Sequence, residues 1–231
     1  MTYFPTFAFC PPSQKWAVLQ AAGVEPLTCP PYHYSPSPPS PSPSPPSTRP
    51  REAKSPVQGR GAGGGLPFDP GSLRNRALLY FSLHGIPNQP YWYGADHVTA
   101  MSTDAFQNLD LSNTIVFVAN CHLAETPFLD AILDCNPLFL AGGKGENFTR
   151  GHTLIGAHLL GYLFRVAVSL HAPPAQALAL AKYTLTLRTD ALQQETERLK
   201  NRSAKRRLNE LRRVREDIAA NRDALDFQSF T

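Results

Sequence analysis

The chain has 231 residues, of which 42% are hydrophobic and 17% charged, so it can form one ordinary globular core and some non-globular material. Its formal charge of +4 comes from one segment, because residues 198–215 hold nine basic side chains and one acidic side chain. No apolar run reaches the roughly 20 residues that span a bilayer, and the first residues lack a secretory signal. We therefore expect a cytoplasmic protein that makes no contact with a membrane.

The four cysteines are Cys10, Cys29, Cys121 and Cys135, and no two of them form a CxxC pair. In a chain of this length without a secretory signal, their spacing does not indicate a disulfide framework. At least one cysteine is therefore free for chemistry.

The residues before position 30 predict the beginning of an α/β domain. Aromatic side chains alternate over Tyr3–Cys10 as in a strand, apolar residues recur at helical spacing over Pro12–Gly23, and Val24–Cys29 fits a short strand. We assign residues 1–29 to the β-α-β start of this domain.

Residues 30–72 are rich in proline, serine and glycine and predict a disordered insert. The first part, PPYHYSPSPPSPSPSPPSTRP, is short of backbone donors and favours extended polyproline conformations. The sequence GRGAGGG that follows it adds flexibility. We favour a linker or surface loop, and the alternative is a processing loop or a docking site for a proline-recognising module.

Between residues 73 and 187, apolar strands alternate with helices. The runs that suit strands buried on both faces are Ala77–Gly85 (ALLYFSLHG), Thr114–His122 (TIVFVANCH) and Pro137–Ala141. Helices are predicted over Ser102–Phe106, Thr126–Cys135 and Thr153–Leu170. This alternation predicts an α/β fold in which helices cover both faces of a mostly parallel sheet.

Residues 188–231 predict a charged helical or coiled-coil tail. Apolar residues recur there at spacings of three, four, seven and nine, at Leu192, Leu199, Leu208, Leu211, Val214, Ile218 and Leu225. This stripe over 192–225 favours self-association or a coiled-coil partner. Nucleic-acid binding by the basic stretch is the less favoured interpretation, although KNRSAKRR also fits a nuclear import signal.

A histidine and a cysteine end two of the predicted strands, and this pairing is the strongest indication of chemistry. Open α/β sheets carry their sites at the carboxyl ends of strands, which is where His84 and Cys121 fall. A cysteine attacks as the thiolate, and an adjacent imidazole promotes its formation. Gly85 lets the backbone approach a substrate, so its N–H and that of Cys121 are candidate donors for an oxyanion. His122 is the weaker partner for Cys121, because consecutive side chains of a strand point to opposite faces.

These residues resemble a known clan of cysteine peptidases. A hydrophobic strand that ends in His-Gly (LYFSLHG), followed by a hydrophobic strand that ends in Cys (IVFVANC), is similar to the clan of caspases, metacaspases, legumain, gingipains, separase and the CHAT domains. The histidine and the cysteine are 37 positions apart, and the sequence between them looks most like a CHAT domain. The resemblance covers roughly residues 77–187 and implies a three-layer caspase-like fold, here with a C-terminal helical extension.

The resemblance also implies roles for the site residues. Cys121 would attack a peptide carbonyl, and His84 would protonate the departing amine and then activate water. The oxyanion would be held by the N–H groups of Gly85 and Cys121. Metacaspases carry an aspartate two residues before the cysteine, where this chain has Ala119, so that position does not predict an acidic pocket for Arg or Lys.

Four residues are candidates for a substrate pocket beside the pair, namely Asp96, Asn120, Glu146 and Asn147. Two of them lie in the glycine-rich sequence GGKGENF, which lacks the spacing of a phosphate-binding loop and is otherwise a turn kept flexible by its glycines. The cysteines and histidines do not have the spacing of metal ligands, so we expect no metal and no organic cofactor.

The sequence therefore predicts a cysteine endopeptidase that acts on protein or peptide substrates. The alternative is a catalytically inactive relative, in which the same fold serves as an interaction or regulatory module attached to a coiled coil. A basic helical binder of nucleic acid is the third hypothesis.

Overall fold

A six-stranded sheet forms the centre of the computed structural model, which describes residues 5–28, 70–94, 98–148, 153–200 and 206–230. In spatial order the strands are β2 (Leu27–Thr28), β1 (Thr6–Cys10), β3 (Leu78–Phe81), β7 (Ile115–Val118), β8 (Phe139–Gly142) and β9 (Gln228–Ser229). The first five strands run parallel, and β9 pairs with β8 in the antiparallel direction.

The sheet is buried on both faces, as its apolar strands predict. Successive residues of a strand point to opposite faces, so Leu78 and Tyr80 enter one core cluster while Leu79 and Phe81 enter the other. The residues of β7 divide in the same way between the two clusters. This explains why the central strands read as continuous apolar runs in the sequence.

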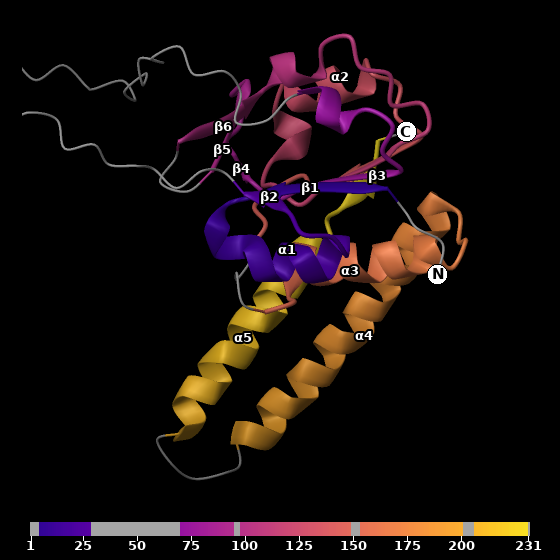
Figure 1. The fold of residues 1–231 in the computed structure, drawn as a ribbon. Coiled ribbons are helices and arrows are strands. Elements are labelled where there is room, and N and C mark those ends of the chain that lie inside the picture. The colour runs from indigo at the N-terminus through magenta and orange to yellow at the C-terminus, as the bar shows by residue number, and fades with distance from the viewer. Residues whose placement is uncertain (1–4, 29–69, 95–97, 149–152, 201–205, 231) are drawn as a thin grey trace, which may run out of the picture.

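Helices and a small second sheet cover the two faces (Figure 1). Helices α1 (Lys15–Ala22), α3 (Gly156–Ser169) and the first half of α4 (Pro174–Lys200) supply the core on one face. The other face is covered by α2 (Phe128–Leu133), the 3-10 turn Thr103–Phe106 and the small sheet. The predicted α/β fold with a mostly parallel sheet is thus confirmed. Before residue 30 the chain forms β1, α1 and the short strand β2, which pairs with β1.

The run Ala77–Gly85 is divided between two sheets, which corrects the prediction of one continuous strand. Strand β3 ends at Phe81, and His84 and Gly85 form β4 of a separate antiparallel sheet. The partners of β4 in that sheet are β5 (Tyr91–Tyr93) and β6 (Thr99–Ser102), which the sequence did not predict. The predicted strand over Thr114–His122 is also shorter, because β7 ends at Val118.

The predicted disordered insert ends earlier than residue 72. Residues Pro70–Leu73 form a 3-10 turn, and Leu73 is fully buried in the core beside the small sheet. Proline has a backbone angle suited to the first position of such a turn, and burial of leucine stabilises it. The rest of the insert, residues 30–69, lies outside the described residues.

The predicted tail is a helical hairpin that returns to the sheet. Helices α4 and α5 (Arg206–Ala224) pack against each other and extend away from the sheet (Figure 1). Leu199, Leu211 and Ile218 of the apolar stripe are buried within the described part, whereas Leu208 is 68% exposed. The chain then places Phe227 in the core and adds β9 to the sheet, so residues 188–231 include an integral strand.

None of the helices in the described residues combines the length and the apolar character needed to cross a membrane.

Candidate active site

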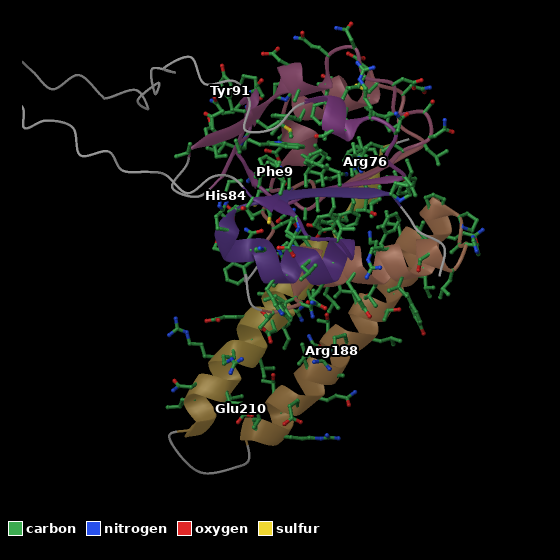
Figure 2. All side chains as sticks on the ribbon, in the orientation of Figure 1. Phe9, Arg76, His84, Tyr91, Arg188 and Glu210 are labelled. Atoms are coloured by element: carbon green, nitrogen blue, oxygen red, sulfur yellow. The ribbon has the colours of Figure 1, made fainter. Side chains whose placement is uncertain are left out.

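His84 lies at the carboxyl end of the central sheet. Arg76 precedes β3 and His84 follows it, and the two lie at opposite ends of the sheet (Figure 2). The side chain of His84 is exposed, and its backbone pairs with Tyr93 of β5. The small second sheet therefore fixes the backbone of His84 from one side.

Cys121 lies beside the His-Gly dipeptide, just beyond the end of the adjacent strand β7. The backbone of Gly85 approaches the carbonyl oxygen of Cys121 so closely that a β-carbon at position 85 would overlap it. Only glycine tolerates this approach without movement of the backbone. The structure thus places the backbone of Gly85, which follows His84 in the chain, directly against the backbone of Cys121.

Asn120 lies beneath the surface and does not line a pocket. Its assignment as a substrate-pocket residue is therefore corrected. Its side chain is fully buried, and its Oδ1 accepts a hydrogen bond of 2.7 Å from the backbone N–H of Leu83. The reason is that β7 ends two residues before Asn120, and its amide satisfies a backbone donor of the segment that follows β3.

The loop of residues 143–148 covers the Cys121 thiol. The backbone N–H of Asn147 donates to Sγ of Cys121 at 3.2 Å, and Sγ lies 3.6 Å from the carbonyl oxygen of Asn147. The Asn147 side chain donates to the carbonyl oxygen of Asn120 at 2.9 Å. The N–H of His122 donates to the carbonyl oxygen of Gly145, also at 2.9 Å. Asn147, a predicted pocket residue, therefore contacts the sulfur of Cys121 through its backbone.

Burial sets the protonation of the thiol. The loss of solvent raises the pKa of Cys121, the N–H of Asn147 lowers it in part, and the carboxylates of Glu146 and Asp223 raise it further. In turn, burial and the neighbouring carboxylates of Asp226 and Glu146 raise the pKa of Asp223. These effects favour the neutral thiol, and a cation beside the sulfur would lower its pKa again.

His122 lies beyond the end of β7, so the alternation of side chains along a strand does not decide where it points. It adopts a left-handed backbone conformation with a φ of 57°. Its Nδ1 lies 3.5 Å from a carboxylate oxygen of Glu125. His122 is therefore engaged with the turn that follows it.

The remaining predictions about ligands concern residues at or beyond the limits of the described chain. Asp96, a candidate pocket residue, lies outside the described residues, as do His97 and His152. Within the described ranges, no three His, Cys, Asp or Glu side chains are grouped to hold a metal ion.

A groove of about 810 Å³ lies between α4 and α5, with Asp190 and Glu197 on one wall and Arg215 and Arg222 on the other.

Sequence reasoning missed Asp223 and the contact of Asn147 with the sulfur. Asp223 lies near the end of α5, about one hundred positions after Cys121, and nothing in the local sequence links the two. The contact of Asn147 depends on the path of a glycine-rich loop, which has few local constraints. The only signal was the position of this loop directly after a strand.

No protein-family model matches the chain, and no curated protein or solved structure matches it significantly.

Proposed function

We propose that the chain is a cysteine endopeptidase of caspase-like fold that cleaves peptide bonds with a His84 and Cys121 dyad. The observation that carries the proposal is the close approach of Gly85 to the carbonyl oxygen of Cys121. It brings a His-Gly segment and a cysteine together at the carboxyl end of two adjacent parallel strands. This is the edge at which open α/β sheets bind their ligands.

In the proposed reaction, Cys121 transfers its proton to His84 and its sulfur attacks the carbonyl carbon of a peptide bond. The N–H groups of Gly85 and Cys121 stabilise the negative charge on the carbonyl oxygen. The imidazolium of His84 gives its proton to the departing amine, which leaves an acyl group on the sulfur. His84 then removes a proton from water, whose attack releases the new carboxylate and restores the thiol.

The raised pKa of Cys121 fits a site in which the imidazole makes the nucleophile. In isolation, this half-buried thiol is a poor nucleophile at neutral pH, because burial and two carboxylates oppose its ionisation. A protonated His84 would offset that cost by pairing with the thiolate. The loop over Cys121 must move before a substrate can reach the sulfur, since Asn147 occupies its hydrogen-bonding positions.

The same covering loop favours a second candidate function. A chain whose loop never leaves the thiol would be an inactive caspase-like module, acting through its surfaces and the α4–α5 hairpin in interaction or regulation. The two functions differ in one measurable property, which is the reactivity of Cys121.

The experiment treats the protein with a library of peptides that carry a thiol-reactive electrophile and compares the labelling rates of Cys121 and Cys135 by peptide mass spectrometry. Cys135 is the internal reference, because burial raises its pKa as well and its sulfur contacts the carbonyl oxygens of Phe106 and Ala131. It is more buried than Cys121, so the effect of His84→Ala on the difference in rate is the decisive result. The endopeptidase predicts faster labelling of Cys121, a dependence on peptide sequence, and loss of the difference in His84→Ala. Equal labelling of both cysteines by all peptides would favour the inactive module.

A further inference from the structure

A buried polar side chain joins β7 to the segment of β3 at each of its two ends. Before β7, the hydroxyl of Thr114 donates a hydrogen bond of 2.7 Å to the carbonyl oxygen of Arg76. After β7, Oδ1 of Asn120 accepts a hydrogen bond of 2.7 Å from the N–H of Leu83. Thr114 and Asn120 are 3% and 0% exposed, so water competes for neither bond.

The second of these bonds holds the backbone next to His84. Leu83 precedes His84 and is fixed by Oδ1 of Asn120, while Gly85 follows it and packs near the Asn120 β-carbon, which would lie 3.8 Å from a β-carbon at position 85. Asn120 is also bonded directly to Cys121 through the peptide link. A single buried residue thus accepts a hydrogen bond from one chain neighbour of the histidine, lies close to the other and is joined directly to the cysteine.

The carbonyl oxygen of Asn120 extends this arrangement to the covering loop. It accepts the hydrogen bond from the side chain of Asn147, whose backbone contacts the Cys121 sulfur. Nδ2 of Asn120 has no hydrogen-bond partner among the described residues, although it is buried. An unpartnered buried amide costs free energy, so stability alone does not account for asparagine at this position.

We propose that Asn120 is a positioning residue, which sets the distance and orientation of the His84 imidazole relative to the Cys121 thiol. This inference rests on the proposed function of the dyad. The hydrogen bond to Leu83 fixes the backbone from which His84 projects, and the peptide link fixes the backbone of Cys121. Removal of the amide releases the histidine segment from the cysteine segment while leaving both reactive side chains in the chain.

The test measures the rate of alkylation of Cys121 by iodoacetamide between pH 5 and 10, resolved by peptide mass spectrometry. An imidazole near a thiol stabilises the thiolate, so the native protein should keep a reactive limb at acidic pH that His84→Ala loses. Asn120→Ala should move the profile toward that of His84→Ala, with alkylation at pH 6 about tenfold slower than in the native protein, which corresponds to about one unit of apparent pKa.

Thr114→Val supplies the matched control, because it removes a buried hydrogen bond between the same two segments at the other end of β7. It should lower the melting temperature and leave the alkylation profile unchanged. Asn120→Ser removes fewer atoms and is too short to reach Leu83, so it decides the question if Asn120→Ala does not fold.

The outcomes separate the two proposals. A native-like profile for the folded Asn120 variants, together with a shifted profile for His84→Ala, overturns the positioning role and leaves the dyad standing. Equal profiles for His84→Ala and the native protein overturn the dyad, and the positioning role with it. An equal shift in Thr114→Val also overturns the positioning role, because it would show a general response to loosening of the sheet.

Discussion

The backbone N–H of Asn147 donates a hydrogen bond to Sγ of Cys121, with 3.2 Å between the nitrogen and the sulfur. The carbonyl oxygen of the same residue lies 3.6 Å from the sulfur, so one peptide unit of the loop meets the thiol as both donor and acceptor. Any reagent that approaches the sulfur along these directions must first displace the loop. The reactivity of Cys121 therefore reports on how firmly the loop is held.

Asn147→Ala should speed the alkylation of Cys121 by a small reagent such as iodoacetamide. The variant keeps the backbone contacts to the sulfur but loses the side-chain bond to the carbonyl oxygen of Asn120. A typical intramolecular hydrogen bond contributes about 0.5–1.5 kcal/mol, so loss of this one should raise the population of the open loop roughly two- to tenfold. Lys144→Ala, an exposed change in the same loop, should have no effect. Slower alkylation of the Asn147 variant would contradict this prediction.

Glu146→Gln should make the thiol more acidic. The carboxylate of Glu146 raises the pKa of Cys121, because a nearby negative charge opposes formation of the thiolate. Removal of that charge should lower the midpoint of the alkylation profile and raise the rate at pH 7 by roughly twofold, a small effect since Glu146 is exposed. Glu210→Gln on α5 changes the net charge equally and is the control (Figure 2). An unchanged midpoint in Glu146→Gln would show that the charge does not act on the sulfur.

The free energy of unfolding should fall in mild acid because of His158. This residue of α3 is fully buried, its Nδ1 lies 3.0 Å from the hydroxyl of Tyr80, and burial lowers its pKa to about 4 from an ordinary value of 6.5. Below pH 6.5 the unfolded chain binds a proton at this site and the folded chain does not. The contribution of the neutral His158 to the free energy of unfolding is therefore fully present above pH 6.5. It is lost as the pH falls toward 4, by about 3 kcal/mol in all.

Denaturant titrations between pH 4 and 8 measure this loss. His158→Gln keeps an acceptor for the Tyr80 hydroxyl and cannot titrate, so its stability should depend less on pH over the same interval. The same pH dependence in both proteins would assign the acid sensitivity to other groups.

Phe227→Ala should destabilise the whole domain and not only the C-terminal residues. The ring is fully buried and stacks on Phe117 of β7 with 5.4 Å between the ring centroids. Replacement of a buried phenylalanine by alanine costs about 3–5 kcal/mol. Leu208→Ala, at an exposed position of the hairpin, should cost little. On heating the Phe227 variant, the far-ultraviolet circular dichroism of the helices and the near-ultraviolet signal of the packed aromatic rings should be lost in one transition. Melting of the helices at a lower temperature than the rings would contradict this.

The central strands could be predicted from the sequence because both of their faces are buried. The runs around Leu79, Phe117 and Leu140 are apolar at nearly every position, which distinguishes such strands from amphipathic ones. The placement of His84 and Cys121 at the carboxyl ends of two neighbouring strands followed from this prediction, because parallel strands present their carboxyl ends on the same side of the sheet.

The small antiparallel sheet had a weaker signal. Its strand β5 has three residues, of which Trp92 is buried and Tyr91 exposed, and three residues of alternation are too few to distinguish from a loop. Strand β9 is shorter still, with two polar residues that pair with Ala141 and Gly142. Its place depends on contacts with residues far away in the chain, which local patterns do not encode.

The late arrival of β9 has a consequence for how the molecule folds. The strand completes its edge of the sheet only after the chain has passed through α3, α4 and α5, so its pairing with β8 closes a very long loop. Closure of such a loop costs entropy before any contact compensates for it. During synthesis, one edge of β8 would therefore stay unpaired until the residues after α5 have been synthesised. In that interval the nascent protein presents an open strand edge, and it is then most exposed to aggregation.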